Sequence, residues 1–507
     1  MEKTASTSRT KKRVLVAYSK ASTYTPTTVE YLTALRNFTD YDVDFVHVTH
    51  DARMNFDMNA YDVVYQNYCA RLCFEGYVSE DYQRALMNFR GLKVLAVQDD
   101  YDRTATLHRA IRRLGFHVLL TCIQRDFWPL AYPRSEIPGV KILQGLTGYM
   151  PENLLKRHAS IARPLAGRDT WVAYRGRDIG ARYGRLGYDK LEIGRYMKEA
   201  CANRGIPHNI AMDDESRIYG DAWFDFLGSS RTMLGSESAS NVFDFDGDVE
   251  HEVSLFAAKH GHPPTYHDFQ CVVDPIEKHF DVGQISPRIF ECALMRTPMI
   301  LFRGRYSDAI TADKHYIALE KDFSNIEAVL ALLGNLDYLQ GFADRAYDKL
   351  VTSGDYGYRS LARLLSDAIE EQYGGQIDTR WVEFRAQTAK PWKALATPQT
   401  PETEEEARQI AYAETPTKEP LGLDDLRARE AEYSRIINEM SARSALATTN
   451  RPAARPPSAS SFAPSIPDYL LAGMNATPFY SVARGVWRMM PAPIRRLIRT
   501  TLGRIHV

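Results

Sequence analysis

Residues 13–37 read RVLVAYSKASTYTPTTVEYLTALRN and join an apolar run to a small polar turn and then to a helical pattern. The run at residues 14–18 is apolar throughout rather than alternating, which is typical of a strand buried on both faces of a parallel sheet. The turn occupies residues 19–26, and the helical pattern follows from Thr27 to about Asn37. A strand, a turn and a helix in this order form the first half of a βαβ unit.

The same unit recurs along the chain in two series. In the first series we expect further strands at residues 43–48, 63–65, 93–97 and 117–121, with a long helical pattern ending at Arg90 and another ending at Arg113. The second series begins after the loop at residues 164–169. Its expected strands are 171–174, 208–212, 231–234, 299–302 and 317–319, and its expected helices are 188–204, 222–229, 286–295, 323–333 and 336–350. The sequence therefore predicts an α/β protein with two Rossmann-like, doubly wound domains facing across a cleft, with the active site at the carboxyl ends of the strands.

The remainder of the 507 residues differs in composition from these two domains. Residues 389–420 are rich in Pro, Thr and Glu, 423–446 form a helical pattern of mixed charge, and 447–467 are rich in Pro, Ala and Ser. We expect five segments, namely a flexible N-terminus at 1–12, a first domain at 13–165, a second at 166–375, a linker with a charged helix at 376–467, and a basic amphipathic segment at 468–507.

Composition and charge narrow the function classes. The formal net charge of −1 disfavours a dedicated nucleic-acid binder, because such a surface would be strongly basic. The six cysteines form no CxxC pair, so the sequence suggests neither a zinc ribbon nor a disulfide framework, and it favours a reduced compartment. The N-terminus lacks the apolar stretch of a secretory signal, and no run of about 18 apolar residues could span a membrane. We therefore expect a cytoplasmic protein.

The most informative motif is ISPRIFECALMRTP, residues 285–298. Ser286 and Pro287 have the residue types preferred at a helix N-cap and at the first helical position. Glu291 then lies near the helix N-terminus, facing the cleft, where a carboxylate can accept two hydrogen bonds from a ribose diol. The alternative is a solvated glutamate favoured by the helix dipole.

Residues 286–291 followed by Thr297 and Pro298 resemble the donor-site helix of GT-B glycosyltransferases, closest to the group that includes CgeB-like and family 4 enzymes. The resemblance extends over GSESASNVFDFDG (235–247) and YRGRDIGARYGRLG (174–187), and covers about residues 170–360. It implies that Glu291 binds the nucleotide ribose, with Ser286 and Arg288 beside it. Such enzymes often carry a second glutamate eight residues earlier, but that position is Gly283 here, next to Gln284.

A basic group follows the first strand of the second domain, namely Arg175, Arg177, Arg182, Arg185 and Lys190. Cations near a departing diphosphate stabilise its developing charge. The resemblance implies an Arg and Lys pair in this role, for which we expect Arg175 and Lys190, with Arg177 as the reserve candidate. The alternative is that most of these five side chains are ordinary surface charges.

The loop GSESASN, residues 235–241, is small and polar and directly follows a strand. Gly235 and Ser236 would let backbone N–H groups approach a phosphate or sugar, and Glu237 could accept a hydrogen bond from the sugar or base. The alternative is a plain connecting turn. Asp244-Phe245-Asp246 resembles an Asp-x-Asp metal motif that belongs to a different glycosyltransferase fold, so we expect no metal site.

Two weaker groups complete the candidate site. Asp99 and Asp100 follow a strand of the first domain and could deprotonate an acceptor hydroxyl if the reaction inverts configuration, although helix capping explains them equally well. His315, which precedes a strand, could contact the donor, the alternative being a structural histidine.

The segment 469–507 has no acidic residue, and arginines interleave with apolar side chains. This pattern favours either a helix on an anionic membrane surface or one that docks on a protein.

Together these features predict a glycosyltransferase whose second domain binds a nucleotide-sugar donor and whose first domain binds a glycan or lipid-linked acceptor. No permanently bound cofactor and no nucleic-acid partner are expected. By resemblance the setting is bacterial surface polysaccharide or glycoconjugate assembly, with peripheral attachment to the inner face of the membrane. Two alternatives remain, namely a non-catalytic scaffold in envelope or spore-coat assembly and a sugar-nucleotide epimerase.

Overall fold

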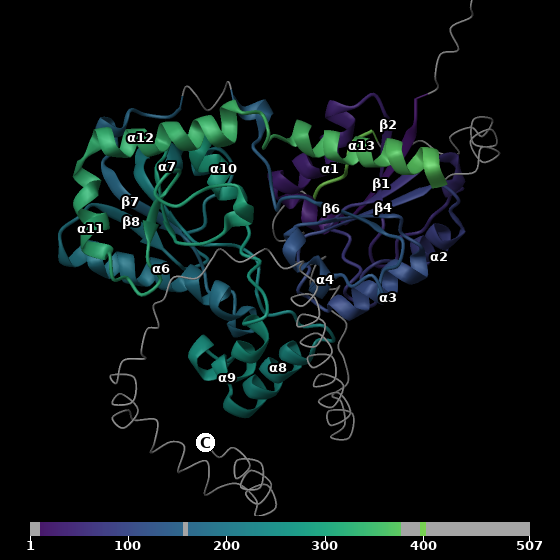
Figure 1. Cartoon of the computed structure of the whole chain (residues 1–507), viewed down its shortest axis with the longest axis horizontal. Helices are drawn as coiled ribbons and strands as arrows, with labels where there is room; N and C mark the ends of the chain where they lie inside the picture. Colours follow the sequence, from purple (N-terminus) through teal and green to yellow (C-terminus); the bar gives the residue numbers. More distant parts are fainter. Residues whose placement is uncertain (1–10, 156–160, 377–395, 402–507) are drawn as a thin grey trace, which may run out of the picture. The chain divides into compact units, whose positions relative to one another are not determined.

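A computed structural model describes residues 11–155, 161–376 and 396–401. These residues contain two parallel β-sheets with helices on both faces (Figure 1). The first sheet has the order β2-β1-β3-β4-β5-β6, and every pairing in it is parallel. Its strands are β1 (Arg13–Tyr18), β2 (Asp42–His47), β3 (Val63–Gln66), β4 (Leu92–Val97), β5 (Val118–Thr121) and β6 (Lys141–Gln144).

The first sheet is covered on both faces, as its sequence predicts. Val14, Leu15 and Val16 are consecutive in β1 and are all fully buried, which requires packing above and below the strand. Figure 1 shows α1 and α13 together on one face and α2 and α3 on the other. These helices are α1 (Pro26–Phe38), α2 (Glu80–Asn88), α3 (Thr104–Leu114) and α13 (Tyr358–Gln376).

The last described helix belongs to the first core rather than the second. Leu361, Leu365 and Ile369 of α13 are fully buried and share a cluster with Leu32 of α1 and Val94 of β4. The expected second domain at 166–375 therefore ends, in packing terms, before α13. The order of elements in the sequence does not show this packing, because α13 follows the strands of the second sheet.

The second sheet has the order β11-β10-β9-β7-β8, again with parallel pairings. Its strands are β7 (Thr170–Arg175), β8 (His208–Ala211), β9 (Ser230–Gly235), β10 (Met299–Phe302) and β11 (Ile317–Leu319). Neighbouring residues of one strand enter opposite cores. Met233 packs in the core of α7 (Asp221–Ser229) and α10 (Pro287–Leu294), whereas Leu234 packs in the core of α6 (Gly184–Asn203) and α11 (Ile326–Ala331). The predicted fold class of two Rossmann-like domains is confirmed.

Several elements differ from the expectation. The helical pattern ending at Arg90 is wrong over most of its length, since α2 begins only at Glu80, where the Ser79 hydroxyl accepts from the backbone N–H of Tyr82 at 3.1 Å. Strand β6 was not expected. Neither were α8 (Asp248–His260) and α9 (Tyr266–Glu277), although Thr265 and Asp268 form a capping box that marks the start of α9.

The α8 region also contacts the first domain. The Arg103 guanidinium, just before α3, binds the Glu250 carboxylate at 2.7 Å, and the backbone N–H of Asp244 donates to Tyr101 at 2.9 Å. Arg182 of the second domain binds Asp102 of the first at 3.2 Å. These bonds hold the carboxyl edges of the two sheets together at this point.

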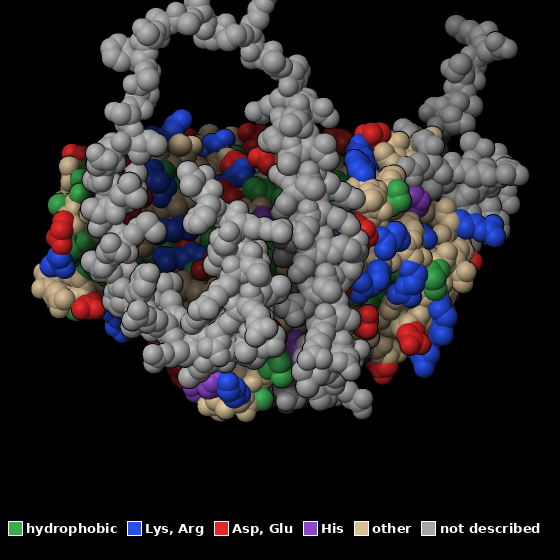
Figure 2. Space-filling model, turned by 60° about the horizontal axis from the view of Figure 1, so that its bottom comes forward, with side chains coloured by type: hydrophobic (Ala, Val, Ile, Leu, Met, Phe, Trp, Pro, Cys, Tyr) green, Lys and Arg blue, Asp and Glu red, His purple; other side chains and the backbone are tan. Residues whose placement is uncertain are grey.

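The outer face of α3 is basic. Its buried stripe includes Leu107, Ile111 and Leu114, whereas Arg109, Arg112 and Arg113 are exposed. Figure 2 shows Lys and Arg side chains gathered over this side of the first domain. Arg109 and Arg112 lie next to acidic partners, so the basic surface is partly neutralised.

A short described segment, residues 396–401, contacts residues of the first domain that are far from it in the sequence. The backbone N–H of Gln399 donates to the Tyr18 hydroxyl at 2.7 Å, and its carbonyl accepts from Thr23 at 3.0 Å. The rest of the expected linker, the charged helix at 423–446 and the basic segment at 468–507 lie outside the described residues. No helix in the described part of the chain is long and apolar enough to cross a membrane. None of the six cysteines, all of which lie within the described residues, forms a disulfide.

Candidate functional site

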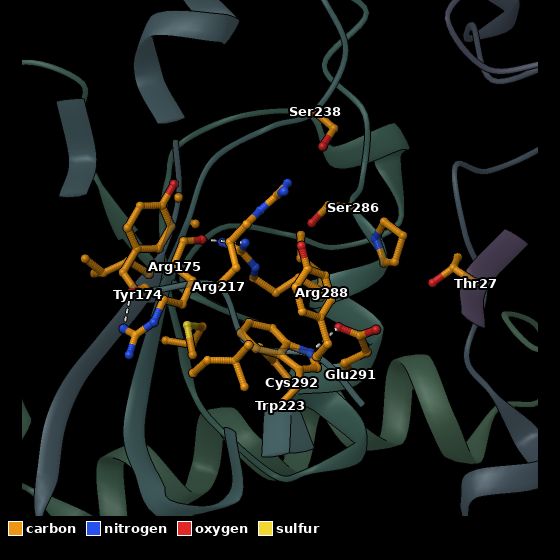
Figure 3. Close-up of a pocket in the computed structure, with 18 of the residues that line it drawn as sticks. Thr27, Tyr174, Arg175, Arg217, Trp223, Ser238, Ser286, Arg288, Glu291 and Cys292 are labelled. Carbon is orange, nitrogen blue, oxygen red and sulfur yellow. Dashed lines mark hydrogen bonds between the residues drawn. The ribbon is translucent and has the colours of Figure 1, made fainter. Parts of the chain in front are cut away.

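A cavity of about 570 Å³ lies at the carboxyl ends of β7 and β9. Its walls come mainly from the second domain, and the start of α1 in the first domain closes one side. Figure 3 shows Arg288, Glu291 and Trp223 grouped in this pocket, with Thr27 approaching from the first domain. The position agrees with the general rule for open α/β sheets, in which ligands bind beyond the carboxyl ends of the strands.

The predicted helix start is present at the pocket wall. Ser286 occupies the N-cap position of α10 and Pro287 the first helical position, although the Ser286 side chain makes no capping hydrogen bond. Ser286, Arg288 and Glu291 all line the cavity. The sequence motif therefore brings a hydroxyl, a cation and a carboxylate to one surface.

Glu291 is held in place by an indole. The Trp223 Nε1–H of α7 donates to Glu291 Oε2 at 2.8 Å. Burial raises the pKa of the Glu291 carboxyl, while this hydrogen bond and the nearby Arg288 charge lower it. Among the described residues no other side chain donates a hydrogen bond to Glu291, so the second carboxylate oxygen can accept from a ligand.

Two cations stand next to each other on the same wall. The Arg288 guanidinium donates to the Arg175 carbonyl at 2.6 Å and lies 5.3 Å from the Tyr174 ring centre and 5.6 Å from that of Trp223. The Lys190 ammonium, from α6, donates to the Glu237 carbonyl at 2.7 Å. Burial and the charge of Arg288 lower the pKa of Lys190 to about 8. A bound anion would relieve this like-charge pair.

Arg175 differs from the expectation. Its backbone lines the pocket, but its guanidinium donates to the Ser216 carbonyl at 2.9 Å and to Asn209 Oδ1 at 2.9 Å, and it lies over the Phe226 ring at 4.4 Å. These partners hold β7, β8 and the following loop together. The structure therefore brings Arg288, rather than the Arg175 guanidinium, beside Lys190. Arg177 lines the cavity and is exposed.

The loop after β9 supplies small residues to the cavity, but not its glutamate. Gly235, Ser236 and Ser238 line the pocket. The Glu237 carboxylate is only 4% exposed and accepts from the Arg305 backbone N–H at 2.6 Å, with the Lys321 ammonium 3.5 Å away. The Glu237 side chain, expected to contact a sugar or base, is therefore not among the groups that line the cavity in this conformation.

The buried position of the Glu237 carboxylate explains the glycine found eight residues before Glu291. A Cβ at Gly283 would lie 1.8 Å from Glu237 Oε1, and one at Gly304 would lie 2.3 Å from the Glu237 carboxyl carbon. Both positions are therefore restricted to glycine while Glu237 stays in place.

Asp99, Asp100 and His315 do not line the cavity. Asp100 is fully buried and accepts hydrogen bonds from Thr121 and Tyr132, and burial raises its pKa to about 7. Asp99 binds the Arg71 guanidinium at 3.2 Å. His315 is 6% exposed and accepts from the Thr311 backbone N–H at 2.9 Å. In this conformation the side chains of Asp99, Asp100 and His315 contact other parts of the protein and are not among those that line the cavity.

The Asp244-Phe245-Asp246 motif has a structural role. The Asp244 carboxylate accepts from the backbone N–H groups of Gly247, Val249 and Glu250 at 2.9 to 3.3 Å, at the start of α8. Within the described ranges, no group of three or more His, Cys, Asp or Glu side chains could hold a metal ion.

Several pocket residues were not identified from the sequence. Trp223, Arg217 and Tyr219 come from the loop after β8 and from α7, and Thr27 and Glu30 come from α1. These residues share one feature, their position after the carboxyl ends of strands β8 and β1, where ligands bind in open α/β sheets. No motif distinguishes them from other loop residues.

No protein-family model matches the chain, and no curated protein sequence matches it either. Several solved structures have a similar fold. An alpha-glucosyltransferase in complex with UDP-glucose and DNA containing an abasic site is 11% identical at a TM-score of 0.44, over 71% of this chain and 100% of that one. Anabaena Alr3699/HepE in complex with UDP and glucose is 9% identical at a TM-score of 0.40, over 71% of this chain and 100% of that one. AviGT4, a glycosyltransferase involved in avilamycin A biosynthesis, is 10% identical at a TM-score of 0.35, over 72% of this chain and 98% of that one. None of these TM-scores reaches 0.5, so they carry no conclusion about the chemistry of this chain.

Proposed function

We propose that this protein is a glycosyltransferase that uses a nucleotide-sugar donor. The observation that carries the proposal is the pocket itself, which combines a carboxylate, two adjacent cations and aromatic side chains. Each group suits one part of a nucleoside diphosphate. Glu291 can accept from ribose hydroxyls, Arg288 and Lys190 can bind the diphosphate, and Trp223 and Tyr219 can pack against the base.

The transfer step follows from these positions. The acceptor hydroxyl oxygen bonds to the anomeric carbon of the sugar while the bond from that carbon to the diphosphate oxygen breaks. The electron pair leaves with the diphosphate, next to Arg288 and Lys190, whose charges stabilise it. The hydroxyl proton passes to a base or to the departing diphosphate. Neither Asp99 nor Asp100 is placed to act as that base in the present conformation.

The acceptor is proposed to be a glycan or a lipid-linked glycan, bound on the side of the pocket formed by α1. The likeness of residues 286–298 to CgeB-like and family 4 enzymes supports bacterial polysaccharide or glycoconjugate assembly as the setting, and the basic segment 469–507 supports peripheral membrane attachment.

The test is a thermal-shift panel of UDP, GDP, ADP, CMP and dTDP on wild type, Glu291→Ala and the control Glu199→Ala. Glu199 is exposed on α6 and lies outside the pocket. A ligand that binds only the native state raises the melting temperature. One nucleotide should stabilise wild type and Glu199→Ala but not Glu291→Ala. If no nucleotide shifts the wild type at millimolar concentration, the transferase proposal fails and a non-catalytic scaffold becomes the better account.

A further inference from the structure

We propose that Glu30, on α1 of the first domain, is a second ribose-binding carboxylate that acts together with Glu291 of the second domain. This inference rests on the proposed function, because it assigns a residue to the nucleotide site described above. It adds a donor contact from the domain otherwise expected to hold only the acceptor.

Glu30 is placed by the geometry of α1. Thr27 and Glu30 are three residues apart, so they lie on the same face of the helix, and both line the pocket. Pro26 at the helix start lines it as well. The first turn of α1 therefore presents one face to the cavity that contains Glu291.

The start of α1 is held by α13. The Tyr358 hydroxyl donates to the Thr27 carbonyl at 3.3 Å, and Tyr358 is 3% exposed. Its ring packs 6.2 Å from Tyr31 of α1 and 5.6 Å from Tyr149. This support fixes Glu30 relative to the first sheet.

Glu30 and Glu291 are close enough for the charge of Glu291 to disfavour ionisation of Glu30. Burial acts in the same direction, and together they raise the pKa of Glu30 to about 7. No Lys or Arg of the described residues forms an ion pair with Glu30. A carboxylate that has no cationic partner and shares a pocket with a second carboxylate is unfavourable unless a ligand donates a hydrogen bond to it.

This arrangement selects the kind of ligand group that fits between the two carboxylates. A phosphate would be repelled, so the diphosphate belongs beside Arg288 and Lys190 instead. A vicinal diol carries two O–H donors and no charge, so one hydroxyl can donate to each carboxylate. The ribose of the nucleotide is the diol of the proposed donor. A ribose bound in this way contacts both domains.

The experiment measures dissociation constants by calorimetry for UDP, ADP and GDP and for their 2′-deoxy and 3′-deoxy counterparts. The proteins are wild type, Glu30→Ala, Glu30→Gln, Glu291→Ala and the control Glu75→Ala, Glu75 being exposed in the first domain. For the nucleotide that binds, wild type and Glu75→Ala should prefer the ribonucleotide about tenfold over both deoxy forms, since each hydroxyl donates to one carboxylate. Glu30→Ala should reduce the preference over one deoxy form to less than about threefold and keep the preference over the other, and Glu30→Gln, which keeps an acceptor oxygen, should recover part of the loss.

Two results would overturn the inference while leaving the proposed function in place. In the first, Glu30→Ala keeps the full preference for the ribonucleotide. In the second, it weakens ribonucleotide and deoxynucleotides equally. If wild type binds none of the three ribonucleotides, the proposed function fails and this inference fails with it. If Glu30→Ala does not fold, Glu30→Asp, whose side chain is one methylene shorter, is read by the same criteria.

Discussion

The two sheets are built alike, but the polar side chains at their carboxyl ends differ in what they contact. Beyond the first sheet, Asp100 is fully buried and bonded to Thr121 and Tyr132. Beyond the second sheet, Arg288 and Glu291 line an open cavity. Strand order indicates where a site can form, but burial decides whether a side chain there binds a ligand or stabilises the fold.

Among the differences between the carboxyl ends of the two sheets, the largest expected effect is the loss of stability on replacing Asp100. Replacing Asp100 by Ala removes the acceptor for the Thr121 and Tyr132 hydroxyls inside the core, and should lower the free energy of unfolding by about 3 kcal/mol. Denaturant unfolding measures this loss, with Asp99→Ala as the control because Asp99 is part of a solvent-exposed ion pair. Equal stability of the two variants would contradict a structural role for Asp100.

Within the second domain, Arg288 and Arg175 allow the same comparison between a ligand-binding and a structural side chain. Arg288→Met should weaken binding of the nucleoside diphosphate about 30-fold, equivalent to about 2 kcal/mol, because it removes a charge from the pocket. Arg175→Met should change that affinity less than about threefold and instead lower stability, since its guanidinium contacts Ser216 and Asn209. Calorimetry measures the affinity of both variants for the nucleoside diphosphate, and thermal melting measures their stability. If Arg175→Met weakens binding and Arg288→Met does not, Arg175 is the phosphate ligand instead.

The carboxylate pair across the pocket should make stability depend on pH. The folded pKa of Glu30 is raised to about 7 from an ordinary 4.5, so between these values the folded protein binds more protons than the unfolded chain. The free energy of unfolding should therefore fall as pH rises from about 4.5 to 7 by about 1–2 kcal/mol more in wild type than in Glu30→Gln. Parallel curves for the two proteins in denaturant titrations at pH 5, 6, 7 and 8 would show that Glu30 does not titrate in this range.

The smallest expected effect concerns Lys190. Its pKa of about 8 means that Lys190 loses its charge as pH rises through 8, and diphosphate affinity should then fall about threefold between pH 7.5 and 8.5. Lys190→Arg keeps its charge over this interval and should show a flatter profile. Identical slopes for wild type and Lys190→Arg would place the phosphates elsewhere.

Most of the sheet architecture followed from the sequence because buried parallel strands are continuous apolar runs. Residues 14–18 and 299–302 illustrate this pattern, and both are strands. Strand β6 at Lys141–Gln144 has polar residues at both ends, so it lacks a continuous apolar run and is not recognised in the same way. The sheet against which α13 packs is decided by contacts between residues far apart in the sequence, which no local pattern encodes.

The site was predictable only where local geometry decides it. Glu291 and Ser286 could be placed because a helix start fixes their direction, and both line the pocket. Arg175 and Glu237 follow strands correctly, yet their side chains turn toward other partners. Glu30 could not be found, since its proximity to Glu291 exists only when α1 and α10 are brought together by the fold. The roles of all these residues in binding remain predictions.

The most direct test is a crystal structure of the wild-type protein with the nucleoside diphosphate that gives the largest thermal shift. The account predicts ribose oxygens within hydrogen-bond distance of the Glu291 carboxylate, and diphosphate oxygens next to Arg288 and Lys190. A nucleotide bound at the carboxyl edge of the first sheet, or one in this pocket whose ribose makes no contact with Glu291, would contradict it.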